Sequence, residues 1–158
     1  MADDAPAPAR RYVVDQAGGN IALDLYVLDQ HLGAVLDAAL ASVGLTASLY
    51  AVYSQLAQGP LTPRDLSETL GIRPTTLSGH LGTMQRSGHL TRSRNERDGR
   101  SWLLELTDAG RAKVEESRPV MRAVVGAIDE QIGTAEDVRR ARDLLARLDR
   151  AVLAVHRH

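Results

Sequence analysis

Residues 61–106 read LTPRDLSETLGIRPTTLSGHLGTMQRSGHLTRSRNERDGRSWLLEL, and they decide the fold. A short helix begins with Thr62 and Pro63, since threonine caps helix starts and proline fits the first helical position. Glycine often ends a helix, so this one stops at Gly71 and a second helix begins at Pro74. Two helices joined by a short turn that contains glycine indicate a helix-turn-helix.

The second helix combines an apolar stripe with a face of small residues. Leu77, Leu81 and Met84 recur at steps of four and three, so they share one side of the helix. The other positions are largely threonine, serine and glycine. Such a face fits a major groove about 12 Å wide and presents hydroxyl groups to base edges and phosphates. The pattern therefore indicates a helix that binds double-stranded DNA.

The rest of the stretch predicts a β-hairpin, with strands near residues 90–93 and 101–106. Alternation in the second strand places one face against the helices, with Trp102 as the expected anchor. The charged tip contains good turn residues between Arg97 and Arg100. A basic hairpin beside a helix-turn-helix is a wing, and this position favours DNA contact by both arginines over a merely solvated turn.

The net charge of −1 hides an uneven distribution along the chain. Residues 71–104 carry six Arg and two acids, which gives +4. The preceding segment carries three Arg and eight acids (−5), and the following one has ten of each. A local basic segment is typical of a DNA-binding footprint. Arg73, Arg92 and Arg94 fit phosphate contacts, although a solvated surface predicts the same residues.

The remaining segments are expected to form an arm and a dimerisation region. Residues 1–19 are rich in Ala, Pro and Asp, which predicts a flexible N-terminal arm. Residues 20–45 and 107–158 predict long amphipathic helices, and Pro119 is a candidate kink. Their apolar surface exceeds what one domain of this size covers, which suggests a homodimer. The fold class is thus mainly α, with a DNA-binding lobe at residues 46–106 that carries the β-hairpin wing.

Several classes of function lack their sequence signals. There is no cysteine, no phosphate-binding glycine loop, no HExxH pair and no nucleophile elbow. The chain also lacks an apolar run of membrane-spanning length or a signal peptide. We therefore expect a cytoplasmic protein that is not an enzyme and has no cofactor, metal or membrane partner. A helical dimeric protein-interaction module without sequence-specific DNA binding remains the alternative.

Three ordered motifs resemble the MarR family of bacterial transcription regulators. The first joins Leu66, Leu70 and Gly71 to residues 75–78, and the second is Met84 followed by RSGHL at residues 86–90. The third is Asp98-Gly99-Arg100, followed by LTDAG at residues 106–110. The resemblance covers nearly the whole chain beyond the arm. Gly79 and Gly82 depart from the family pattern, which often has larger or basic residues there.

The resemblance implies roles for individual residues and a mode of action. Asp98 would hold the wing tip, and Arg100 would enter the minor groove. The second helix would supply four residues to the major groove: Thr75, Thr76, Ser78 and His80. Family members are two-fold dimers, so a pseudo-palindromic operator and repression are expected. A small aromatic effector that relieves binding would occupy a pocket between the dimerisation region and the DNA-binding lobe.

Overall fold

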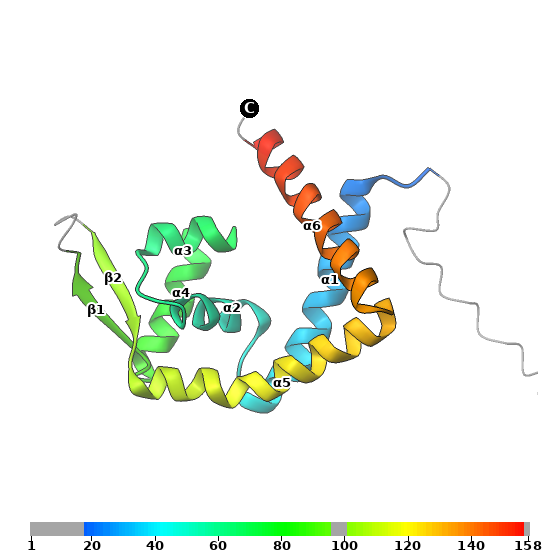
Figure 1. Ribbon diagram of the computed structural model, residues 1–158. Helices are drawn as coiled ribbons and strands as arrows, with labels where there is room; N and C mark the ends of the chain where they lie inside the picture. Colours follow the sequence, from blue (N-terminus) through cyan, green and yellow to red (C-terminus); the bar gives the residue numbers. More distant parts are fainter. Residues whose placement is uncertain (1–17, 96–100, 157–158) are drawn as a thin grey trace, which may run out of the picture.

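The computed structural model describes residues 18–95 and 101–156, which form a helical lobe with a hairpin at its edge and an arch of long helices (Figure 1). The predicted arm (residues 1–17) and wing tip (residues 96–100) lie outside the described residues. The described elements confirm a mainly α protein with a β-hairpin. They are α1 (Ile21–Leu40), the short 3₁₀ turn η2 (Ala41–Val43), α2 (Ala47–Leu56), α3 (Pro63–Leu70), α4 (Pro74–Arg86), β1 (Leu90–Arg94), β2 (Trp102–Leu106), α5 (Asp108–Ile132) and α6 (Ala135–His156).

Local side chains begin four of the helices. In each case the side-chain oxygen of the capping residue accepts a hydrogen bond, 3.0–3.2 Å long, from the backbone N–H three residues later. The caps are Asn20, Thr46, Thr62 and Thr107. Gly71 ends α3 with a φ of 63°, a left-handed conformation that favours glycine. These starts and stops agree with the sequence prediction.

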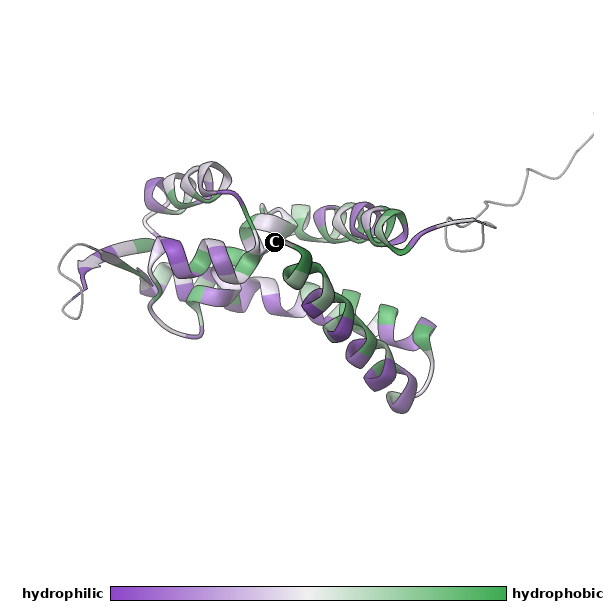
Figure 2. Cartoon of the chain, turned by 90° about the horizontal axis from the view of Figure 1, so that it is seen from above, coloured by the Kyte–Doolittle hydropathy of each residue, from purple (hydrophilic) through white to green (hydrophobic). Residues whose placement is uncertain are grey.

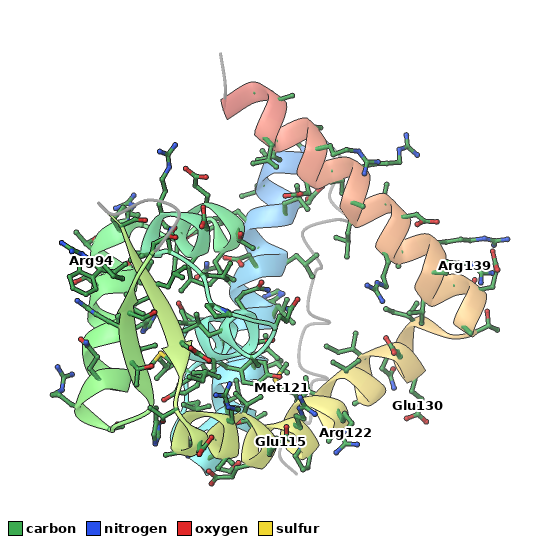
Figure 3. All side chains as sticks on the ribbon, turned by 60° about the vertical axis from the view of Figure 1, so that its left-hand side comes forward. Arg94, Glu115, Met121, Arg122, Glu130 and Arg139 are labelled. Atoms are coloured by element: carbon green, nitrogen blue, oxygen red, sulfur yellow. The ribbon has the colours of Figure 1, made fainter. Side chains whose placement is uncertain are left out.

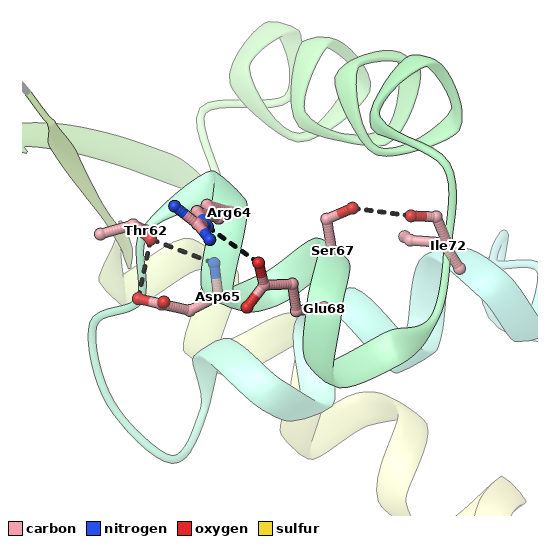
Figure 4. A network of polar contacts seen from close by, with 6 residues as sticks. All are labelled: Thr62, Arg64, Asp65, Ser67, Glu68 and Ile72. Atoms are coloured by element: carbon pink, nitrogen blue, oxygen red, sulfur yellow. Dashed lines mark hydrogen bonds and ion pairs between the residues drawn. The ribbon is translucent and has the colours of Figure 1, made fainter. Parts of the chain in front are cut away.

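Polar contacts hold both the start of α3 and the turn between α3 and α4 (Figure 4). The Thr62 hydroxyl donates to Asp65 at 2.7 Å, which completes the cap at the start of α3. The Ser67 hydroxyl donates to the Ile72 carbonyl at 2.7 Å and so ties α3 to the turn itself. The helix-turn-helix therefore has its own local scaffold in addition to its apolar core.

The core of the lobe lies where α2, α3, α4, the hairpin and the start of α5 meet. The predicted stripe of α4 is buried there, and Leu104 and Leu106 anchor the hairpin with at most 1% of their surface exposed. Leu40, Val52, Leu56, Leu66 and Val114 complete the contacts between elements. Burial of several Leu and Val side chains, each worth about 1.5–3 kcal/mol, fixes α4 and the hairpin in one arrangement.

The start of α5 packs closely on the root of the hairpin. A Cβ placed on Gly110 would lie 2.3 Å from the carbonyl oxygen of His89, so only glycine fits there. That same carbonyl accepts a hydrogen bond from the Thr107 N–H at 3.1 Å. On its other side, His89 Nδ1 lies 2.7 Å from the Tyr53 hydroxyl of α2. Burial raises the pKa of Tyr53 above its ordinary value of 10, because the charged phenolate would lose hydration there.

Beyond the lobe, α5 leads into the arch formed with α1 and α6 (Figure 1). The helix continues through Pro119, so the candidate kink does not divide it. Hydrophobic residues recur along the terminal helices (Figure 2), and many of the large ones there are more than a third exposed. This surface needs a partner to cover it.

No single described helix is long and apolar enough to cross a membrane. The pair Ile21–Val43 and Ala47–Leu56, bent by 72° at its break, passes that test by length and composition. Its second member contributes Leu49, Val52, Tyr53 and Leu56 to the core of the lobe.

Candidate nucleic-acid interface

The first turn of α4 exposes most of the residues predicted from the sequence. Thr75, Thr76 and Ser78 are exposed, while Leu77 between them is buried in the core. Arg73, the residue before the helix, is also exposed. The structure therefore brings four of the sequence-predicted residues together at one end of α4.

His80 is placed differently from these four residues. Its Nε2 lies 2.8 Å from the Ser48 hydroxyl of α2, and its side chain is half-buried. Burial lowers the pKa of His80, because the charged imidazolium loses hydration there. The imidazole thus faces α2 and not the exposed surface with the threonines.

The two glycines of α4 have different surroundings. A Cβ on Gly79 would meet nothing within 4 Å, so its exposed backbone is open to an approaching molecule. A Cβ on Gly82 would lie 3.3 Å from the guanidinium of Arg86, which folds back and donates to the Thr83 hydroxyl at 3.0 Å. Gly82 therefore makes room for a cation on the helix, a role that the sequence pattern did not reveal.

The hairpin has a cationic side as well as an apolar root. Residues paired across antiparallel strands point to the same face, and Arg92 pairs with Leu104 while Arg94 pairs with Trp102. Arg92 Nη2 donates to Gln85 Oε1 of α4 at 3.1 Å. Arg94 is exposed on β1, on the opposite side of the molecule from α6 (Figure 3).

The outer end of the hairpin differs from the sequence prediction. Trp102 is 53% exposed, so the prediction that it anchors the wing is wrong: the hairpin extends past the helices at this position, and Leu104 and Leu106 provide the anchor. Arg97, Asp98 and Arg100 lie outside the described residues, and their roles stay predictions.

A surface cleft of about 630 Å³ separates α3, α4 and the hairpin. We call it the hairpin cleft. It joins Ser78 and Arg92, which the sequence predicts as possible DNA contacts, to Trp102, which the sequence predicts as a packing residue. Its complete lining is Pro63, Arg64, Ser67, Glu68, Pro74, Leu77, Ser78, Leu81, Arg92, Trp102 and Leu104.

A second groove, of about 600 Å³, lies between α2 and the middle of α5. We call it the junction groove; Glu115, Met121 and Arg122 of its lining lie close together on α5 (Figure 3). Tyr50, Arg118 and Val125 complete the lining, and an ion pair of 3.2 Å joins Arg118 to Glu115. Within the described part of the chain, no three His, Asp or Glu side chains gather where they could hold a metal ion.

Known proteins of similar sequence and fold are transcription regulators. A profile described as the MarR family matches residues 44–101. The chain is 24% identical over 141 residues to the HTH-type transcriptional repressor YetL of Bacillus subtilis. The aligned region covers 85% of this chain and 84% of YetL.

Two solved structures from Mycobacterium tuberculosis have similar folds at 26% sequence identity. The transcriptional regulator MosR, in complex with DNA, has a TM-score of 0.68 over 84% of this chain and 98% of that one. A MarR family protein in complex with salicylic acid has a TM-score of 0.65, over 85% of this chain and 98% of that one. These matches show that the chain is similar to MarR-family transcription regulators, and the family profile covers the helix-turn-helix and the first strand of its adjoining hairpin.

Proposed function

We propose that this protein is a homodimeric repressor that binds a pseudo-palindromic operator in double-stranded DNA. The observation that carries the proposal is the exposed face of small residues on α4 beside the cationic side of the hairpin. Two recognition helices of a dimer would enter successive major grooves about one helical turn apart, with the wings in the flanking minor grooves. Repression is supported by the similarity to YetL, which is described as a transcriptional repressor. The proposed regulator acts in the cytoplasm and is not an enzyme.

The exposed residues divide between phosphates and bases. Arg73 and Arg94 supply charge for phosphates, which carry most of the affinity. The hydroxyls of Thr75, Thr76 and Ser78 reach base edges or the nearer phosphates. His80 supports DNA binding indirectly, because the hydrogen bond between its Nε2 and Ser48 holds α4 against α2.

The wing tip is proposed to act in the minor groove. Arg97 and Arg100 would enter it, where a narrow groove concentrates negative potential, and Asp98 would hold the turn. Replacing Arg100 by Ala is expected to weaken DNA binding markedly and to make it less salt-dependent. Unchanged affinity with an unchanged salt slope would remove the wing from the interface.

The dimer is proposed to form through residues 20–45 and 107–158, which leaves residues 46–106 as the DNA-binding lobe. Among the described residues, fourteen large exposed hydrophobic side chains lie on α1, the second half of α5, and α6. They are Ile21, Leu23, Tyr26, Leu28, Leu32, Val35, Val125, Ile128, Ile132, Leu144, Leu145, Val152, Leu153 and Val155. So much exposed apolar surface on a protein of this size marks an interface.

Selection from a random duplex library tests the function directly, because it needs no knowledge of the operator. The selected duplex and a scrambled duplex of equal length are then compared by fluorescence anisotropy over a series of salt concentrations. We expect the selected duplex to bind at least about 10³-fold more tightly, with a steep salt slope. Equal binding of the two duplexes would instead favour a protein-interaction module with the winged fold.

Single variants locate the interface. Arg94→Ala is expected to lower affinity for both duplexes and to reduce the salt slope by about 2, because each of the two protomers loses one phosphate contact. Arg147→Ala, which removes an exposed guanidinium from α6, is the matched control and leaves the slope unchanged. An identical slope for Arg94→Ala and Arg147→Ala would remove Arg94 from the interface.

The junction groove supports a second proposal, that a small aromatic acid relieves DNA binding. The groove lies between the lobe and the dimerisation region, and Arg122 supplies an exposed cation beside the apolar surface of Met121 and Val125. A relative of similar fold is described in complex with salicylic acid. Salicylate should raise the melting temperature of the free protein and weaken operator binding, and Arg122→Ala should remove both effects. A stabilising acid that leaves operator affinity unchanged would contradict the proposal.

A further inference from the structure

Trp102 stands apart from the other large exposed apolar side chains. Of the fifteen found among the described residues, fourteen belong to the terminal helices and are accounted for by a dimer. The remaining one is Trp102, at the outer end of β2 in the DNA-binding lobe. An exposed indole costs solubility and contributes little to the core, so a role at the surface explains it better than a role in packing.

The hairpin cleft beside Trp102 has an apolar floor and a cationic rim. Leu77 and Leu104 lie at its base, each with at most 2% of its surface exposed. Arg64 and Arg92 contribute two positive charges, and Glu68 contributes one negative charge. The Arg64–Glu68 ion pair, at 2.8 Å, balances one of the two cations. The cleft therefore keeps one net positive charge, and Arg92 supplies it.

Arg92 retains capacity for an anion. A guanidinium carries five N–H donors, and the bond to Gln85 uses one of them. This bond also holds the side chain across the space between β1 and α4. A cation fixed in this way is well suited to a phosphate oxygen.

The position of the cleft identifies what would fill it. The proposed function places α4 in a major groove and the hairpin in the adjacent minor groove. Those two grooves of B-DNA are separated by one sugar-phosphate strand, so that strand must pass between α4 and the hairpin. The hairpin cleft is the surface opening between these elements.

We propose that the hairpin cleft holds the sugar-phosphate backbone of one DNA strand, with the Trp102 ring packed against a deoxyribose and Arg92 bound to the neighbouring phosphate. The inference rests on the proposed function and extends it by adding Trp102 as a contact residue and by giving Arg92 a defined place in the same site. Neither contact reads a base. Both should therefore strengthen binding to any duplex and fix the register of the reading helix α4.

Trp102 is the only tryptophan in the chain, so its fluorescence reports on this site alone. Acrylamide quenching of the full-length protein is measured while the anisotropy of a labelled duplex is followed in the same sample. We expect both the selected and the scrambled duplex to reduce quenching at saturation. Quenching that stays unchanged while anisotropy shows bound DNA would overturn the inference and leave the proposed function intact. A duplex that never binds would instead contradict the proposed function.

Variants separate the apolar contact from the charge. Trp102→Ala is expected to weaken binding to both duplexes about tenfold at an unchanged salt slope. Trp102→Phe should recover part of that loss of affinity. Arg92→Ala should weaken binding to both duplexes and reduce the salt slope by about 2, one phosphate contact for each protomer, whereas Arg147→Ala should leave both unchanged. Melting curves check that each variant is folded. Wild-type affinity in folded Trp102→Ala, or protection of Trp102 by salicylate but not by duplex, would overturn the proposal.

Discussion

The Ser48 hydroxyl and His80 Nε2 lie 2.8 Å apart, and their hydrogen bond joins α2 to α4. One residue earlier, the Ala47 N–H donates to the Asp37 carboxylate of α1 at 2.6 Å. Two adjacent residues of α2 are therefore bonded to a terminal helix on one side and to α4 on the other. This short chain of contacts holds α4 in a fixed orientation relative to α1.

The half-buried position of His80 predicts a dependence of stability on pH. Its pKa in the folded protein lies below the ordinary value of 6.5 because burial disfavours the charged form. Between the folded pKa and 6.5 the unfolded chain binds more protons, so acidification through that window lowers the free energy of unfolding. Above this window both states are neutral and the group contributes nothing.

Urea unfolding at about pH 5 and about pH 7.5 measures this effect. The wild-type protein should lose more stability on acidification than His80→Gln, which cannot take up the proton. An equal loss in both proteins would assign the pH dependence to other groups.

The bond between Tyr53 and His89 predicts a specific loss on removing one hydroxyl group. Tyr53→Phe leaves His89 Nδ1 without its partner at 2.7 Å and should lower the free energy of unfolding by about 1 kcal/mol. Tyr50→Phe is the matched control, because Tyr50 lies on the same helix and makes no side-chain hydrogen bond to another described residue. Denaturant melts of the two variants should differ by that amount, and coincident curves would contradict it.

Two glycines of α5 predict opposite effects of the same substitution. Gly110→Ala forces a methyl group to 2.3 Å from the His89 carbonyl oxygen and should destabilise the lobe by about 1–3 kcal/mol. Gly126→Ala meets nothing within 4 Å and should stabilise the helix by up to about 1 kcal/mol. Thermal melts of both variants measure the difference. A stable Gly110→Ala protein would mean that α5 can move away from the hairpin root at little cost.

Gly79 predicts a separation of stability from DNA binding. Its Cβ position is open, so Gly79→Ala should raise the free energy of unfolding by about 0.5–1 kcal/mol. The added methyl group would stand on the face proposed to meet DNA, so affinity for the selected duplex should fall. Increased stability together with unchanged affinity would show that the backbone of α4 does not approach the DNA closely at this point.

Much of the fold follows from the sequence because its signals are local. The caps at Thr62 and Thr107 act over three residues, and the stop at Gly71 depends on one backbone conformation. The apolar stripe of α4 could also be predicted from the sequence, because its spacing of three and four residues follows from the repeat of the helix. These short-range causes operate before any tertiary contact forms.

The directions of individual side chains depended on long-range packing. The sequence placed His80 with the DNA-contacting residues, but Ser48, 32 positions earlier, holds its imidazole against α2. Strand alternation placed Trp102 among the buried anchors, yet the strand extends beyond the helices that would cover it. Periodicity assigns a residue to one side of an element and carries no information about where the neighbouring element ends.

The sequence by itself therefore determined the elements, their order and the basic segment at residues 71–104, because capping, periodicity and charge are local properties. Only the tertiary structure decided which side chains of that segment remain free to bind. It turned His80 inward, left Trp102 exposed and placed Arg92 across the hairpin cleft. The physical reason is that exposure is set by contacts between residues distant in the chain, and folding alone brings those residues together.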